Sequence, residues 1–87
     1  MASYSLILNK QVRKKDLPRV PSKTRQRIVD MIEKLQVNPR PPGVEKLTNR
    51  EEYKLRSGNY RILYVVDDPK KTVEIRAIRH RGEAYKK

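Results

Sequence analysis

Apolar residues recur along this chain with two periods, one typical of a helix and one typical of a strand. In the stretch SKTRQRIVDMIEKLQVNP four apolar side chains fall at i, i+3, i+4 and i+7, namely Ile28, Met31, Ile32 and Leu35. The stretch starts at Ser22, a favourable N-cap, and Asn38-Pro39 ends it. The pattern therefore predicts an amphipathic helix whose apolar face lies in the core.

The second half of the chain alternates as strands do. The segment EYKLR, a turn at Ser57-Gly58-Asn59, and the segment YRILYVV predict two strands of a hairpin. In the second strand one face carries Tyr60, Ile62, Tyr64 and Val66, and the other carries Arg61, Leu63 and Val65. Because both faces are largely apolar, we expect this strand to be central. A turn at DDPKK leads to the returning strand TVEIRAIRH, with one face formed by Val73, Ile75 and Ala77.

The N-terminal part predicts one more strand and one short helix. SYSLILN is rich in residues that favour strands, so we expect a strand over Ser3 to Leu8. A helix from about Lys10 to Leu17 follows, ended by Pro18. Its exposed cations are Lys10, Arg13, Lys14 and Lys15. The segment NPRPPGVEKLTNREE holds three prolines and predicts a connecting loop; a proline-rich ligand segment is the alternative.

Taken together, these elements predict an α+β fold of order β-α-α-β-β-β in a single domain over residues 1–87. Short turns join the last three strands, which makes a mainly antiparallel four-stranded sheet. The two N-terminal helices must cover one face of that sheet, since the apolar side of the second helix has no other surface to bury. The opposite sheet face is left open.

The net charge of the chain indicates which kind of partner binds to the open sheet face. The chain has 22 Lys and Arg against 10 Asp and Glu, a net charge of +12. Such a field attracts polyanions, so a nucleic acid, the ribosome, acidic lipid headgroups or an acidic protein is the expected partner. A small protein that only coats RNA or DNA has the same composition. The absence of cysteine and the single histidine predict no disulfide and no metal cofactor. Apolar runs of a few residues and no signal-peptide pattern predict a cytoplasmic protein without a membrane partner.

Arg61 is the first candidate for chemistry, because it interrupts an otherwise apolar strand and needs an anion opposite it. A carboxylate is one possibility, from Glu45, Glu51, Glu52 or Glu74. A phosphate is the other, since the guanidinium fork matches two of its oxygens. We expect Arg61 on the open face together with Lys54 or Arg56 and the segment from His80 to Tyr85.

His80 and Tyr85 lie among cations, which favour a neutral imidazole and a tyrosinate. Either residue is then a candidate general base, although a strand-end histidine and a packed tyrosine are the structural alternatives. Cleavage of RNA needs a base for the 2′-hydroxyl, cations for the transition state and a proton donor for the 5′-oxygen. This group of residues contains the side chains for all three roles.

The segments LQVNPRPPGVEKL, YKLRSGNYRILY and IRHRGEAY, in this order, resemble RelE-type toxins of the RelE/ParE superfamily across nearly the whole chain. The resemblance implies an endoribonuclease that cuts mRNA in the ribosomal A site through the message's own 2′-hydroxyl. It also implies a cognate acidic antitoxin as partner, beside mRNA and the 16S rRNA of the ribosome. Two alternatives remain, a ParE-like inhibitor of DNA gyrase and a non-catalytic RNA-binding module.

Carried over by position, the catalytic set of the family falls on Lys54, Arg61, Arg81 and Tyr85, and His80, a further candidate catalytic residue, stands where several members also have histidine. Neighbouring cations expected to bind RNA phosphates are Lys46, Arg50, Arg56 and Arg79. The sequence departs from the family pattern at Glu52, where a second lysine is expected, and in the shorter spacing from Arg81 to Tyr85. The identity of the general base, His80 or Tyr85, therefore stays open.

Overall fold

The computed structural model describes residues 4–47 and 52–80, which form one sheet and a set of N-terminal helical turns. The elements are β1 (Ser5–Leu8), η1 (Val12–Asp16), α1 (Leu17–Arg19), α2 (Ser22–Lys34), β2 (Glu45–Leu47), β3 (Glu52–Ser57), β4 (Tyr60–Asp67) and β5 (Thr72–His80). In this part of the chain no helix combines the length and the apolar character that crossing a bilayer requires.

The sheet has five strands in the order β1-β5-β4-β3-β2, so the prediction of four strands was wrong by one. The additional strand is β2, three residues that pair with β3 in a segment expected to be a loop. So short an edge strand has no alternating pattern to reveal it. Strands β3 to β5 pair antiparallel as expected, and β2 also pairs antiparallel with β3, whereas β1 runs parallel to β5. The helical segment between β1 and β5 permits this parallel pairing, which needs a long crossover.

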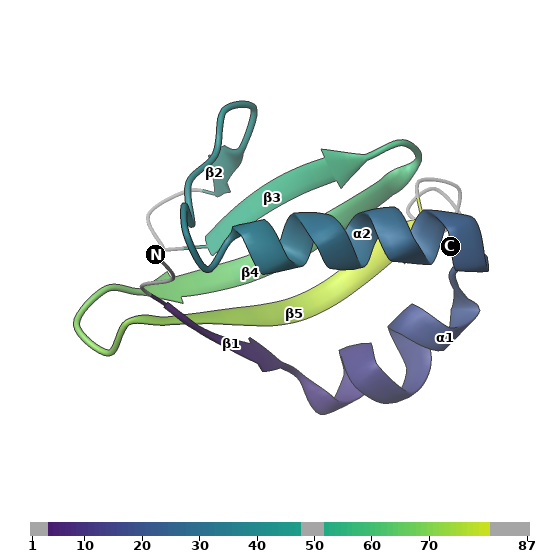
Figure 1. Ribbon diagram of the computed structural model, residues 1–87, viewed down its shortest axis with the longest axis horizontal. Helices are drawn as coiled ribbons and strands as arrows, with labels where there is room; N and C mark the ends of the chain where they lie inside the picture. Colours follow the sequence, from purple (N-terminus) through teal and green to yellow (C-terminus); the bar gives the residue numbers. More distant parts are fainter. Residues whose placement is uncertain (1–3, 48–51, 81–87) are drawn as a thin grey trace.

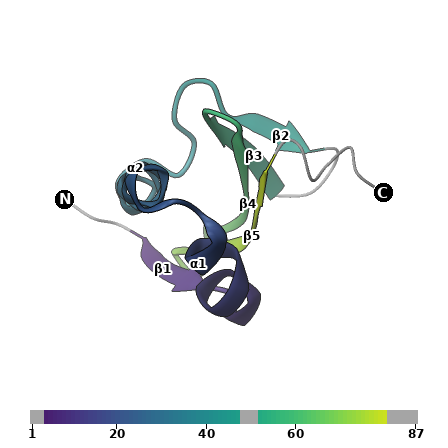
Figure 2. The same cartoon turned by 90° about the vertical axis from the view of Figure 1, so that its right-hand side faces the viewer.

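Both helices lie on one face of the sheet, as predicted (Figures 1 and 2). The predicted apolar side of α2 is confirmed, because Ile28, Ile32 and Leu35 are at most 2% exposed. They share one core cluster with the alternate residues of β4, which are Ile62, Tyr64 and Val66. Among the described residues, no helix lies on the other face of the sheet (Figure 2).

The first helical segment is longer and less regular than predicted. It continues through Pro18 to Arg19, with a π-helical stretch over η1 in which the backbone N–H of Leu17 bonds to the carbonyl of Val12. Pro18 lies in the first turn of α1, directly after the π-helical stretch, a position at which proline is common in helices. Ser22 is the first residue of α2 rather than its N-cap, a position that Pro21 occupies without a side-chain bond.

A register shift in β5 changes which of its side chains face the helices. Leu63 pairs with Ala77 but Tyr64 pairs with Ile75, so Arg76 is an extra residue. Beyond it the alternation is reversed, and Ala77 does not share the face of Val73 and Ile75 as predicted. The next residue, Ile78, pairs with Ile62 and is buried in the core instead.

On the side of β5 that faces away from β4, the end of the strand is held by Asp16 rather than by β1. Strand β1 pairs with β5 only as far as Ile75. Two residues beyond the extra residue, the backbone N–H of Ile78 donates to Asp16 Oδ2 at 3.0 Å. Asp16 is only 4% exposed, so η1 covers the edge of β5 and satisfies its buried donor.

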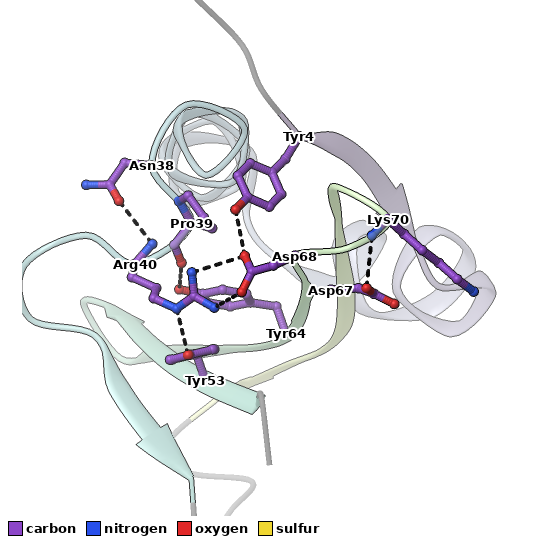
Figure 3. Close-up of polar contacts among 9 residues, drawn as sticks. All are labelled: Tyr4, Asn38, Pro39, Arg40, Tyr53, Tyr64, Asp67, Asp68 and Lys70. Carbon is purple, nitrogen blue, oxygen red and sulfur yellow. Dashed lines mark hydrogen bonds and ion pairs between the residues drawn. The ribbon is translucent and has the colours of Figure 1, made fainter.

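Far from this contact, Arg40 and Asp68 join the loop after α2 to the β4–β5 turn (Figure 3). Arg40 Nη2 lies 2.8 Å from Asp68 Oδ2, and Arg40 Nε donates to the Tyr53 hydroxyl at 2.8 Å. The Tyr4 hydroxyl donates to Asp68 Oδ1 at 2.6 Å, which adds the residue before β1. These bonds lower the pKa of Asp68, mainly through Arg40 and then through Tyr4.

The same loop is also held through a buried tyrosine. The Tyr64 hydroxyl donates to the carbonyl of Pro39 at 2.7 Å, and burial raises the pKa of Tyr64. The Tyr64 ring stacks on Tyr53 with 5.6 Å between centroids. The loop that leads into β2 is therefore fixed to the sheet, which sets the pairing of β2 with β3.

We predict that Asp16→Ala destabilises the protein, because it leaves the buried N–H of Ile78 without an acceptor. The expected loss is about 1–3 kcal/mol of unfolding free energy. Asp16→Asn, which keeps an acceptor oxygen, should lose less. Urea denaturation of the three proteins measures the difference, and equal stability of the wild type and Asp16→Ala would contradict the prediction.

The lowered pKa of Asp68 predicts acid sensitivity. The pKa of the Asp68 carboxyl is lower in the folded chain than its ordinary value of 3.8. Its stabilising contribution is therefore complete above pH 3.8 and is lost as the pH falls through the folded pKa. Asp68→Asn should therefore reduce the dependence of stability on pH below about 4. Thermal unfolding at several pH values tests this, and an unchanged pH profile would be the contrary result.

Candidate functional site

Three arginines lie side by side across the open face of the sheet. Arg56 on β3 pairs with Arg61 on β4, and Arg61 pairs in turn with Arg79 on β5. Their alternation with the buried residues Leu55, Ile62 and Ile78 places all three on the face without helices. We call Arg56, Arg61 and Arg79 the arginine row.

The arginine row is not neutralised by the described carboxylates. Like charges directly opposite one another in a sheet are unfavourable. Within residues 4–47 and 52–80 none of the three arginines has an ion-pair partner: Glu45 pairs with Lys54 at 3.3 Å, and Glu74 with Arg76 at 3.9 Å. A salt bridge from Arg61 to Glu45 or Glu74 is thus not formed, and Glu51 lies outside the described residues. The row suits an anion with several oxygens, such as a phosphate.

Lys54 lies on the same face, two residues before Arg56 on β3. Its side chain is 21% exposed, and the ion pair with Glu45 on β2 holds its ammonium group. The sheet therefore brings together Lys54, Arg56, Arg61 and Arg79 from the residues that the sequence singles out.

His80 lies on the other face, so its expected position beside Arg61 was wrong. It pairs with Tyr60, and the two rings meet edge to face with 4.9 Å between centroids. Both rings line a hollow of about 290 Å³ together with Asp16 and Arg19, on the side that the helices cover. The extra residue Arg76 is the cause, because it reverses the alternation of the residues after it.

The remaining predicted residues do not join the row. Lys46 pairs with the buried Tyr53 and so has the alternation of the helix-covered face. Arg50, Arg81 and Tyr85 lie outside the described residues.

Sequence reasoning missed Asp16 and the Arg40–Asp68 pair. The sequence does single out Asp16, because it is the one acid among eight cations between Lys10 and Arg27. No sequence pattern indicates the Arg40–Asp68 pair, since 28 positions separate the two residues. The sequence also indicates the reversed alternation in β5, because Ala77 and Ile78 are adjacent apolar residues in a strand that otherwise alternates.

The fold and the family profile together define a class of small toxins. The chain belongs to the RelE/ParE superfamily of such toxins. The profile of the family described as "ParE toxin of type II toxin-antitoxin system, parDE" matches residues 6–85. No curated protein sequence matches the chain significantly.

Solved structures of RelE toxins have the same fold. The RelB-RelE antitoxin-toxin complex from Methanococcus jannaschii matches with 30% identity and a TM-score of 0.75, over 91% of this chain and 94% of that chain. The RelE-RelB complex from Pyrococcus horikoshii matches with 27% identity and a TM-score of 0.79, over 92% and 97%. An arginine-to-alanine variant of Escherichia coli RelE in the free state matches with 27% identity and a TM-score of 0.74, over 98% and 88%.

The repulsion within the arginine row predicts that an anion stabilises the fold. In dilute buffer Arg79→Gln should be slightly more stable than the wild type, by no more than about 1 kcal/mol. Added inorganic phosphate should raise the melting temperature of the wild type more than that of Arg79→Gln, because the wild type binds it better. Thermal unfolding across a phosphate series measures both effects, with Lys70→Gln, in the β4–β5 turn, as the charge-matched control. Equal phosphate responses in all three proteins would contradict an anion site at the row.

Proposed function

We propose that this toxin is an endoribonuclease that enters the ribosomal A site and cuts the bound mRNA through its 2′-hydroxyl. The observation that carries the proposal is the arginine row, three guanidinium groups on adjacent strands of a sheet face without helices. The similarity to RelE toxins supports the same conclusion. Such a protein acts in the cytoplasm, where messages are translated.

In the proposed reaction the 2′-oxygen attacks the adjacent phosphorus while the bond from phosphorus to the 5′-oxygen breaks. The general base takes the proton of the 2′-hydroxyl and the leaving 5′-oxygen takes a proton from water, so the products are a 2′,3′-cyclic phosphate and a free 5′-hydroxyl. Negative charge builds up on the phosphate oxygens in the transition state, and fixed cations stabilise it. Arg61, at the centre of the row, binds these oxygens, while Arg56 and Arg79 hold the neighbouring backbone. Lys54 supplies a further positive charge on the same face.

Proton transfer is assigned to residues other than the row. A guanidinium keeps its proton at any biological pH, so the arginines act by charge and not as general acids. Arg81 is proposed as a further phosphate ligand and Tyr85 as the general base, on the resemblance alone. His80 is left out of the catalytic set, because its ring packs against Tyr60 on the helix-covered side.

The proposed partner is a cognate acidic antitoxin. RelE toxins from Methanococcus jannaschii and Pyrococcus horikoshii are known in complexes with RelB. For this chain, with a net charge of +12, carboxylates of an antitoxin would neutralise the arginine row and exclude RNA from it.

Inhibition of DNA gyrase is a second candidate function, favoured by the family profile, whose description is that of a ParE toxin. This function needs no RNA cleavage. It predicts loss of supercoiling by purified gyrase when the toxin is added, and intact message in a translating extract.

We predict that Arg61→Ala and Arg81→Ala each slow cleavage of translated mRNA by about 100-fold or more, the usual effect of removing a charge-stabilising donor. Primer extension on mRNA from a translating extract locates and quantifies the cuts. The control variant Lys34→Ala/Lys70→Ala removes two exposed cations elsewhere and should cleave normally, as should His80→Gln.

Cleavage by an Arg61→Ala/Arg81→Ala double variant at the wild-type rate would exclude the proposed reaction. An intact message with wild-type toxin, together with inhibited gyrase, would establish the second function instead. Intact message without gyrase inhibition would leave only an RNA-binding role.

A further inference from the structure

Strand β1 is an uncharged edge of an otherwise highly charged sheet. It lies at one end of the strand order, and Figure 1 shows no described element beyond it. The first nine residues, MASYSLILN, contain no charged side chain, although 37% of the chain is Asp, Glu, Lys or Arg. The opposite edge strand, β2, differs, because two of its three residues are charged, Glu45 and Lys46. Charged residues on an edge strand discourage pairing with another chain, so β2 is protected and β1 is not.

The backbone of β1 offers hydrogen-bonding groups on its outer side. The N–H groups of Ser5 and Asn9 donate to backbone carbonyls in the β4–β5 turn and in β5, at 2.8 and 3.0 Å respectively. Since successive residues of a strand alternate in direction, Leu6 and Leu8 direct their N–H and carbonyl groups away from β5. The free edge begins only after Tyr4, whose N–H bonds to a carbonyl just after α2 at 3.1 Å. Outward backbone groups of this kind accept a further strand.

An exposed apolar side chain lies in the middle of this free edge. Ile7 is 45% exposed, one of two large apolar residues of this kind in the described part of the chain. It pairs with Glu74 of β5 and lies on the face without helices, whereas Leu6 and Leu8 pack against the core. The other exposed residue is Val37, in the turn after α2. A strand added to β1 would therefore gain apolar contact as well as backbone hydrogen bonds.

The absence of charge indicates which chain pairs with β1. An acidic protein is attracted by cations, which it finds on the arginine row and not on β1. Two copies of this toxin, each with a net charge of +12, repel each other wherever their cations meet, so they approach with least repulsion at an uncharged surface. The edge is also complementary to itself, because in an antiparallel pair Leu6 lies opposite Leu8 and the two Ile7 side chains meet at the two-fold axis.

We propose that two copies of this toxin associate through their β1 edges, which joins the two sheets into one. In this dimer the backbone of Leu6 exchanges hydrogen bonds with Leu8 of the partner subunit. Edge-to-edge pairing leaves the open sheet face uncovered, so the arginine row stays accessible in both copies. The free edge is part of a strand of four residues, and so short an interface gives a weak dimer that depends on concentration. The association is independent of whether the toxin cleaves RNA.

Sedimentation equilibrium over a range of protein concentrations measures the dimer, and Ile7→Lys tests its position. The substitution places two ammonium groups next to each other at the axis, which should weaken the dimer by about tenfold or more. In the monomer this position is exposed and lies beside Glu74, so the substitution keeps the fold. The matched control is Val37→Lys, which makes the same change away from β1 and should dimerise like the wild type.

Two further measurements distinguish a pair of cationic chains joined through their backbones. Added salt should tighten the dimer, because it screens the repulsion between two chains of charge +12. The amide protons of Leu6 and Leu8 should exchange with solvent more slowly as the protein concentration rises. This slowing should be much weaker in Ile7→Lys at the same concentrations.

A wild-type chain that stays monomeric at all concentrations would leave the edge to a different partner and overturn the proposal. Equal dimerisation of Ile7→Lys and the wild type would place the interface elsewhere, and an equal loss in Val37→Lys would assign the effect to net charge. Assemblies that grow beyond a dimer would contradict the two-fold pairing of β1.

Discussion

The single extra residue in β5 decides which side chains meet on the open face of this toxin. With a regular ladder from Val73 through Ile75, Arg79 would lie opposite Tyr60 under the helices, and Ile78 would lie opposite Arg61 in solvent. The bulge at Arg76 exchanges these positions. Ile78 enters the core, where it is 4% exposed, and Arg79 joins Arg61 on the face without helices. Burial of one apolar side chain and formation of the arginine row are therefore two results of the same backbone irregularity.

The arginine row is electrostatically unfavourable in the isolated protein. Three guanidinium groups occupy adjacent cross-strand positions, while nearby carboxylates pair with Lys54 and Arg76 instead. Rigid elements hold the row in place: Asp16 fixes the end of β5, and the Arg40–Asp68 pair fixes the loop that leads to β2. A preformed cluster of repelling charges binds an anion without first reorganising.

The sequence alone determined the α+β class, the apolar side of α2, the central position of β4 and the bounds of β5, because each depends on a local period of apolar residues. It also determined the net positive charge and the resemblance to RelE toxins. Tertiary structure alone decided that β2 joins the sheet, that β1 pairs with β5 in parallel, and that His80 faces the helices while Arg79 faces the open side. The reason is that strand pairing and register depend on contacts between residues far apart in the chain, and a shift of one residue moves every later side chain to the opposite face.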